Sequence, residues 1–172
     1  MSDKVSAAAL SQLAQADFAA ALEGIFEHSP WVAERAWTRR PFRDRDALAA
    51  ALVEAMHGAD RDRKLALIRA HPELAGRAAI RGEVTAESAG EQSAAGLNAC
   101  SPEEFARLHD LNRKYRDRFG FPCIIAVKNL TRADIIATME ARLHNEPAAE
   151  FEQCLGQIAR IATLRLCERV SA

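Results

Sequence analysis

A histidine followed by a proline interrupts a chain that otherwise has the pattern of successive helices. His71 and Pro72 stand in the stretch AHPELAG, directly after the amphipathic run DRDRKLALIRA. Proline disfavours the helical conformation of the residue before it, so we expect the helix to end at about Ala70. The negative end of the helix dipole then favours a proton on the imidazole, which titrates near neutral pH. His71 is therefore either a candidate acid–base catalyst or a histidine that only caps helix carbonyls.

A hydroxyl and a carboxylate share one face of another predicted helix. Ser88 and Glu91 are three residues apart in AESAGEQSAAG, a run rich in small residues that would let a ligand approach closely. Glu91 is then either a ligand-binding residue or an ordinary solvated carboxylate. The sequence pattern leaves both interpretations open.

An arginine continues the apolar stripe of the last predicted helix. The stripe advances by four, three, four and three residues through Phe151, Leu155, Ile158, Ala162 and Arg165. A buried arginine is costly unless it is paired. We expect its planar guanidinium to bind either a carboxylate of the protein or an anionic ligand, with two hydrogen bonds.

The cysteines and histidines show none of the spacings that are typical of metal sites. No C-x-x-C pair joins the four cysteines, which are Cys100, Cys123, Cys154 and Cys167. The histidines form no H-x-x-x-H or H-E-x-x-H pattern, and glycine-rich nucleotide loops are missing from the sequence. A metal-dependent hydrolase built on His71 and Glu91 would lack a third ligand. We therefore expect reduced, partly buried thiols, no metal and no cofactor.

Length and charge restrict the class of protein. The 172 residues suit a single domain, 1–172, whose core needs no disulfide. A net charge of −1 argues against nucleic acid or an anionic membrane as the main partner. No apolar run approaches the length of a membrane span, and the N-terminal stretch MSDKVSAAALSQL has no signal-peptide core. We therefore expect a cytoplasmic protein with no membrane partner.

Apolar stripes and capping residues predict several helices in the first part of the chain. The first is indicated by a stripe at i, i+4, i+7 and i+8, formed by Phe18, Leu22, Ile25 and Phe26. Ser29 is placed to cap the second helix, with Pro30 in its first turn. Gly58 ends a third helix, and Asp60 caps a fourth.

Similar signals continue in the second part of the chain. Thr85 is placed to cap a helix over residues 86–97. Ser101 and Glu104 form a capping box for a long helix that Gly120 ends.

The run FPCIIAVKN is the one stretch with a β-like composition, and it has no evident partner strand. We predict that it is a buried extended connector near residues 121–128. Thr131 then caps a further helix, and the last helix begins at about Pro147. The predicted fold is all-α, a single-domain bundle of about seven or eight helices.

Five motifs together resemble one known family. The stretches EHSPWVAERA, IRAHPELAGRAA, TAESAGEQSAAGL, FGFPCIIAVK and IARIATLRL occur in order and at the right separations over nearly the whole chain. In this respect the sequence is similar to the 2-oxo-4-hydroxy-4-carboxy-5-ureidoimidazoline (OHCU) decarboxylases. The resemblance implies an all-α enzyme without a cofactor that acts on a small molecule, OHCU, in the last step from urate to (S)-allantoin. It also implies a homodimer.

The resemblance assigns roles residue by residue. The implied catalytic residues are His71, as the acid–base group near the substrate hydroxyl, and Glu91, which orients it or binds ring N–H groups. The implied substrate-binding residues are Pro72, Ser88, Gln92, Pro122, Cys123, Ile124, Ile125 and Arg165. The chain departs from the family pattern at Cys123, where an aromatic or bulky residue is expected, so the resemblance does not define the pocket wall there.

A non-enzymatic helical module that binds a partner protein is the main alternative function. Such a module would present an exposed apolar stripe without converging polar residues. The polar candidates of this chain come from three separate segments, which favours a pocket.

Overall fold

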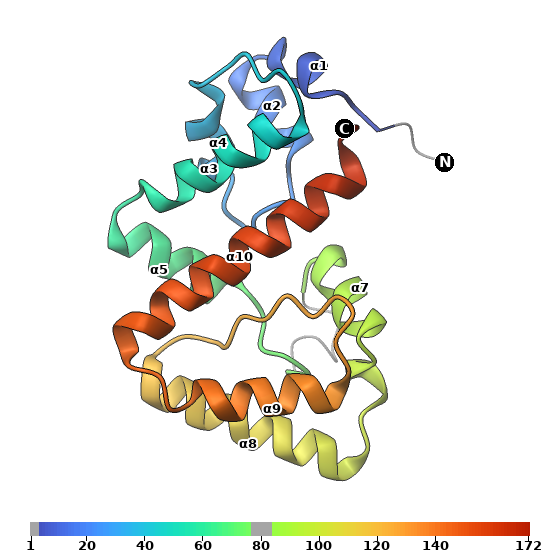
Figure 1. The fold of residues 1–172 in the computed structure, drawn as a ribbon, viewed down its shortest axis with the longest axis vertical. Helices are drawn as coiled ribbons and strands as arrows, with labels where there is room; N and C mark the ends of the chain where they lie inside the picture. The colour runs from blue at the N-terminus through green and yellow to red at the C-terminus, as the bar shows by residue number, and fades with distance from the viewer. Residues whose placement is uncertain (1–3, 77–83) are drawn as a thin grey trace. The chain divides into compact units, whose positions relative to one another are not determined.

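The computed structural model describes residues 4–76 and 84–172. These residues contain nine α-helices and one short 3-10 helix (Figure 1). Within these ranges the β-structure consists of a single bridge between Val5 and Val170. The predicted all-α class is therefore confirmed. None of the described helices combines the length and the hydropathy that crossing a membrane requires.

Contacts within the chain divide it into two compact units. Unit 1 extends to Leu67 and resumes at Ala159, and unit 2 comprises Ile68–Ile158. The elements of unit 1 are α1 (Ala7–Ser11), α2 (Gln15–Ala21), α3 (Trp31–Trp37), α4 (Arg45–His57), most of α5 (Arg61–Ala70) and the second half of α10 (Pro147–Arg169).

The N-terminal part of unit 1 differs from the sequence prediction in three places. Helix α1 was not expected; it is a short helix capped by Ser6, whose hydroxyl accepts from Ala9 N–H at 3.1 Å. Helix α2 ends at Ala21 rather than continuing through Phe26, because the chain turns at Gly24, which has a positive φ of 81°. Ser29 does not cap α3, since its hydroxyl donates to the carbonyl of Glu27 at 2.8 Å.

The helices that follow in unit 1 are as expected. Helix α4 ends in the predicted turn at Gly58, and Asp60 caps α5 by accepting from Arg63 N–H at 2.8 Å. The predicted apolar stripes supply the core of this unit, whose largest fully buried side chains include Phe18, Leu48, Leu52 and Met56.

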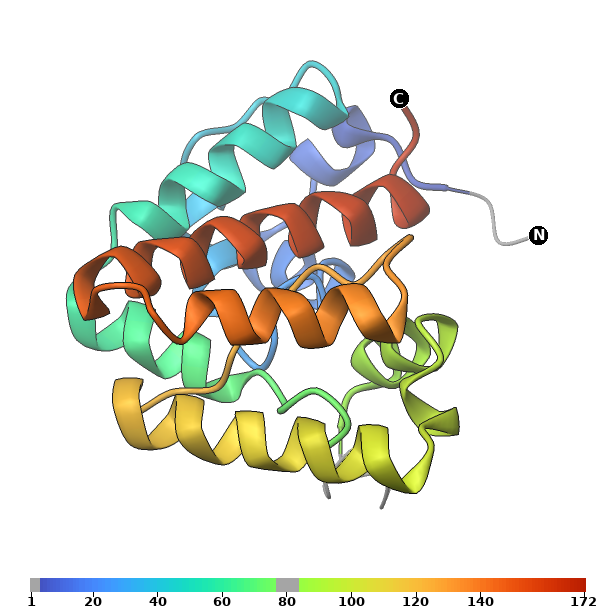
Figure 2. The ribbon, with the colours of Figure 1, turned by 60° about the horizontal axis from the view of Figure 1, so that its bottom comes forward.

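Unit 2 contains the end of α5, α7 (Ala86–Ala94), the 3-10 helix η1 (Leu97–Ala99), α8 (Pro102–Phe119), α9 (Arg132–Arg142) and the first half of α10. Ser101 and Glu104 form the predicted capping box of α8, and Thr131 and Asp134 form another at α9. Helices α8 and α9 lie side by side in both views (Figures 1 and 2). Helix α7 stops three residues short of the predicted end, because Gly96 adopts a positive φ of 75°.

The stretch Phe121–Val127 is the predicted extended connector. It runs beside α9 and is buried, with the partial exception of Pro122 (Figure 1). No strand pairs with it in the described ranges, so side chains satisfy part of its backbone. This feature of the predicted fold is confirmed.

Candidate active site

The first candidate residue lies where the sequence places it. Helix α5 ends at Ala70, and the next residue, His71, is buried in unit 2. Its backbone N–H donates to Ile68 C=O at 3.2 Å, which closes the last turn of the helix. Pro72 follows and prevents the helix from continuing. The break therefore fixes the position of the backbone from which the imidazole extends. Residues 77–79, the last three of the motif IRAHPELAGRAA, lie outside the described residues.

The turn after His71 has a strained backbone that two side chains hold. Ala75 has a φ of 50°, which is unfavourable for a residue with a Cβ atom. The amide of Gln92 on α7 accepts from Ala75 N–H at 2.9 Å and donates to Glu73 C=O at 3.3 Å. Asn112 on α8 donates to Leu74 C=O at 2.8 Å. These contacts bring the His71 segment and α7 together within unit 2, and they give Gln92 a positioning role that the sequence did not predict.

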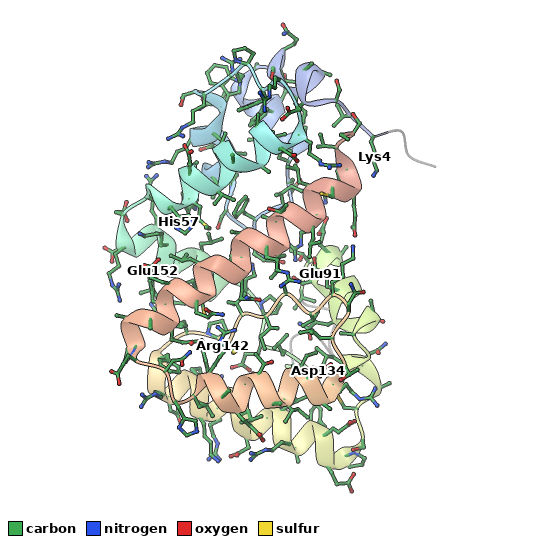
Figure 3. All side chains as sticks on the ribbon, viewed as in Figure 1. Lys4, His57, Glu91, Asp134, Arg142 and Glu152 are labelled. Atoms are coloured by element: carbon green, nitrogen blue, oxygen red, sulfur yellow. The ribbon has the colours of Figure 1, made fainter. Side chains whose placement is uncertain are left out.

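Helix α7 is unusual because its buried side chains are polar. Ser88 and Gln92 are buried on it. Glu91, which Figure 3 labels, lies between them in the sequence, shares their face by helical spacing and is half-buried. Buried polar residues are informative because burying a polar group costs free energy unless it is hydrogen-bonded or paired. Glu91 is therefore not the fully solvated carboxylate of the alternative interpretation. The shared face predicted for Ser88 and Glu91 agrees with this arrangement.

Side chains from α9 and α10 hydrogen-bond to the backbone of the connector. Ile124 C=O accepts from Arg142 Nη1 at 2.5 Å, and Ala126 N–H donates to Gln157 Oε1 at 2.9 Å. Successive residues of an extended chain direct their backbone groups to opposite edges. The groups of Ile125 therefore point away from Arg142 and Gln157, and no described residue hydrogen-bonds to them. This edge can bind a ligand that carries amide donors and acceptors.

The side chain of Cys123 is part of the hydrophobic core. Its side chain is buried close to Tyr115 and Cys154, and burial raises the pKa of its thiol to about 12. Burial also raises the pKa of Cys154. Both thiols are therefore protonated at neutral pH, and the reactive form of cysteine is the thiolate. All four cysteines are free, as expected, and the two buried ones are poor candidates for a nucleophile.

A buried ionic cluster in unit 2 was missed by the sequence analysis. Arg142 donates from Nε to Glu150 Oε1 at 2.7 Å, and Glu150 is 0% exposed. Asn145 donates to the other carboxylate oxygen at 2.8 Å, and the hydroxyl of Tyr115 also donates to Glu150. A signal was present, because Arg142 continues the stripe of Ile135 and Met139 on α9. An arginine in the last turn of a helix also complements the helix dipole, so the position by itself does not distinguish a buried arginine from an exposed one.

Arg165 has a protein partner. It lies in unit 1, 3% exposed, and its Nη2 is 3.1 Å from the carboxylate of Glu27, which is 1% exposed. Nη1 donates to Gly24 C=O at 2.8 Å. The structure therefore bears out the interpretation in which Arg165 pairs with a buried carboxylate. The turn after α2 supplies this carboxylate, and a role of Arg165 in binding an anionic ligand stays a prediction.

The described residues contain no cluster of histidine, cysteine and acidic side chains that could hold a metal ion. The polar groups that unit 2 provides are the buried imidazole of His71, the half-buried carboxylate of Glu91, the buried hydroxyl of Ser88 and the backbone amides of the connector. Such groups can orient a polar molecule and transfer protons.

Comparison with known proteins identifies the family. A family model described as OHCU decarboxylase matches residues 11–167. A 2-oxo-4-hydroxy-4-carboxy-5-ureidoimidazoline decarboxylase of Haloferax volcanii is 41% identical over 163 residues, which are 95% of each chain. The mouse protein of the same name is 35% identical over 91% of this chain and 88% of its own.

Solved structures agree with this result. A crystal structure of (S)-allantoin synthase superimposes with a TM-score of 0.75 at 30% identity, over 96% of this chain and 54% of the longer one. A structure of OHCU decarboxylase in the presence of (S)-allantoin gives a TM-score of 0.69 at 21% identity, over 84% of this chain and 93% of that one, which supports the fold. The chain therefore belongs to the OHCU decarboxylase family.

Proposed function

We propose that this protein decarboxylates OHCU and releases (S)-allantoin in urate degradation. The observation that carries the proposal is the polar buried face of α7, which Gln92 joins to the turn after His71. The names of the relatives supply the substrate, since the Haloferax volcanii and mouse proteins are named as decarboxylases of this compound.

The reaction suits a protein that has no cofactor. In OHCU one carbon carries both the carboxylate and a hydroxyl, and it lies next to a C=N bond. When the bond to CO2 breaks, its electron pair flows into this C=N bond, so the substrate provides its own electron sink. A proton must then be added to the product from one face, which sets its configuration. The enzyme has to orient the carboxylate and manage protons, and both tasks need only side chains and backbone groups.

We assign His71 as the acid–base group near the substrate hydroxyl, with Glu91 orienting it or binding ring N–H groups. Ser88 and the backbone edge at Ile125 bind the ureido and ring amides. Pro72 holds His71 at the helix break, and Gln92 secures the same segment from α7. The connector contributes through its backbone, since the side chain of Cys123 is buried in the core.

Arg165 is retained as a proposed ligand of an anionic or carbonyl oxygen of the substrate, in addition to its pairing with Glu27. Arg165→Lys tests this role, because a lysine keeps the charge beside Glu27 but cannot reproduce a planar fork. We expect a large loss of kcat/KM in this variant. Wild-type kcat/KM in a folded Arg165→Lys protein would leave Arg165 with a structural role only.

We further propose that residues 1–172 act as one domain, that the protein is a cytoplasmic homodimer, and that it needs neither metal nor organic cofactor. The family match supports the single domain, since it runs from residue 11 to 167 across both units. Light scattering coupled to size-exclusion chromatography tests the dimer. A mass of one chain at micromolar concentration would contradict it.

The alternative of a partner-binding helical module finds little support. Val5 is the exposed large apolar side chain among the described residues, so they carry no apolar stripe on their surface. Buried polar residues on α7 also suit a small polar ligand better than a helix.

Binding of the proposed product, (S)-allantoin, tests the location of the site independently of turnover. We expect (S)-allantoin to shift the backbone amide resonances of residues 88–92 and 123–126 in an NMR spectrum of labelled protein. The amides of α3, on unit 1, serve as the internal control. (R)-allantoin should produce weaker shifts at equal concentration, because the site is chiral. Shifts confined to other segments would contradict the assignment of α7 and the connector.

A further inference from the structure

The connector lacks the support that usually fixes an extended chain. A central strand is held by a ladder of backbone hydrogen bonds to its neighbours. Phe121–Val127 has no such ladder among the described residues, although it is almost entirely buried. Two long side chains hydrogen-bond to its backbone instead, that of Arg142 on α9 (Figure 3) and that of Gln157 on α10.

Arg142 is itself fixed from the opposite side. Its guanidinium lies between the carboxylate of Glu150, at 2.7 Å from Nε, and Ile124 C=O, at 2.5 Å from Nη1. Asn145 and Tyr115 bind the same carboxylate, so Glu150 is held in place as well. Buried ion pairs add little net stability compared with well-packed apolar residues. Stability alone is therefore a weak reason for this cluster, and its directional bond to the connector is a better one.

The two supporting bonds lie on either side of Ile125. Arg142 binds the residue before it, through the carbonyl of Ile124, and Gln157 binds the residue after it, through the N–H of Ala126. Both bonds fall on the same edge of the chain, so the backbone N–H and C=O of Ile125 point to the other edge. A tilt of the connector would change the direction of both groups.

We propose that Arg142 and Gln157 are positioning residues, which clamp the connector on both sides of Ile125 and thereby set the geometry of the backbone edge that binds the substrate. This inference rests on the function proposed above. Neither residue touches substrate in this scheme; each acts through the backbone of the connector. Glu150 belongs to the same device, because it fixes the guanidinium of Arg142.

Gln157 provides the sharper test, since it makes a single bond to the connector and is only half-buried. Gln157→Leu removes the acceptor for Ala126 N–H, whereas Gln157→Glu keeps an oxygen at the same distance along the side chain. We expect KM for OHCU to rise about tenfold in Gln157→Leu, the effect of about one net hydrogen bond, with a smaller change in kcat. Gln157→Glu should restore KM to near the wild-type value. Gln153→Leu, one turn earlier on α10 and exposed, is the matched control and should leave KM unchanged.

Arg142→Lys tests the other side of the clamp. A lysine keeps a positive charge near Glu150, so the protein should fold, but its single ammonium group cannot bind Glu150 and Ile124 C=O in the same way as a planar fork. We expect KM to rise in this variant too, by about tenfold.

Amide hydrogen exchange gives a readout that does not depend on activity. Exchange at Ala126 should become about tenfold or more faster in Gln157→Leu, and remain unchanged in Gln153→Leu. A wild-type protein that leaves OHCU untouched would refute the proposed function, whereas the exchange data would still report on the clamp. An active wild type, together with a Gln157→Leu variant that matches it in both KM and exchange, would overturn the clamp. So would a lowered Tm with unchanged KM in both Gln157→Leu and Arg142→Lys, since that pattern indicates a purely structural role.

Discussion

Replacing Arg165 by methionine tests how much this arginine contributes to the stability of the fold, as opposed to the binding of a ligand. The guanidinium is buried, its Nη2 lies 3.1 Å from the buried carboxylate of Glu27, and its Nη1 donates to Gly24 C=O at 2.8 Å. Methionine fits the apolar stripe of α10 in size but supplies neither the charge nor the donors. The Arg165→Met protein must therefore keep a carboxylate in the interior without this cation.

The magnitude follows from the burial of the pair. Removing one partner of a buried ion pair costs about 3–5 kcal/mol, because the other charge stays in a medium of low polarity. For a chain of this size, 1 kcal/mol lowers Tm by about 2–4 °C, so we expect Tm to fall by about 6–20 °C.

Thermal denaturation of a small set of variants checks this result. In the Arg165→Met background, Glu27→Gln should recover most of the lost stability, since it removes the buried charge that Arg165 no longer balances. Arg39→Met is the matched control in the same unit, because Arg39 pairs with Glu54 on the surface and both side chains are at least half-exposed. A surface pair contributes about 0–1 kcal/mol, so this control should lower Tm only slightly.

The outcome that refutes the reasoning is a Tm of Arg165→Met within about 2 °C of wild type at neutral pH, which corresponds to 1 kcal/mol or less. Such a result would mean that the pair with Glu27 contributes little to the free energy of unfolding.

Three further predictions concern activity and pH. His71→Asn should keep the fold but lose on the order of 10²–10⁴-fold in kcat, because asparagine cannot transfer a proton near neutral pH; a folded variant with near-wild-type turnover would remove His71 from the mechanism. Stability should fall between about pH 9 and 12, by about 1.4 kcal/mol per pH unit for a buried thiol, since unfolded Cys123 loses its proton near its ordinary pKa and the folded thiol does so only near 12. Cys123→Ala should make this alkaline decline shallower in denaturant titrations, and an unchanged slope would contradict the assignment. Exhaustive EDTA treatment should leave activity intact, and a loss that a divalent cation restores would revive a metal-dependent mechanism.

Local signals predicted most of the fold. The capping boxes at Ser101 and Thr131 and the turn at Gly58 involve residues within a few positions of each other, so short sequence patterns contain the whole interaction. The extended connector was also predictable, because a β-like run without a partner has few other places in an all-α chain. The apolar stripe fails as a signal at Gly24, where it predicted that a helix continues but the glycine adopts a positive φ and the chain turns.

The electrostatic partners were not predictable from the sequence. Glu27 lies 138 residues from Arg165, and it follows directly on the stretch through Phe26 that was predicted as helix but forms a turn. Arg142 and Glu150 are close in sequence, but each stands at a helix end, where a charged residue also complements the dipole. The sequence identified Arg165 as a charged residue on a buried face. It did not identify Glu27, Arg142 or Glu150, whose burial and pairing depend on how segments pack in three dimensions.

The central claim is that this chain decarboxylates OHCU with control of configuration, and circular dichroism tests it most directly. OHCU should be generated freshly and mixed with the protein, and the optical signal of allantoin should be followed against the spontaneous decay of the same solution. We predict a faster reaction that yields (S)-allantoin in large enantiomeric excess, and a His71→Asn protein that gives only the racemic background. A decay rate equal to that of the protein-free control, or a racemic product at an accelerated rate, would contradict the claim.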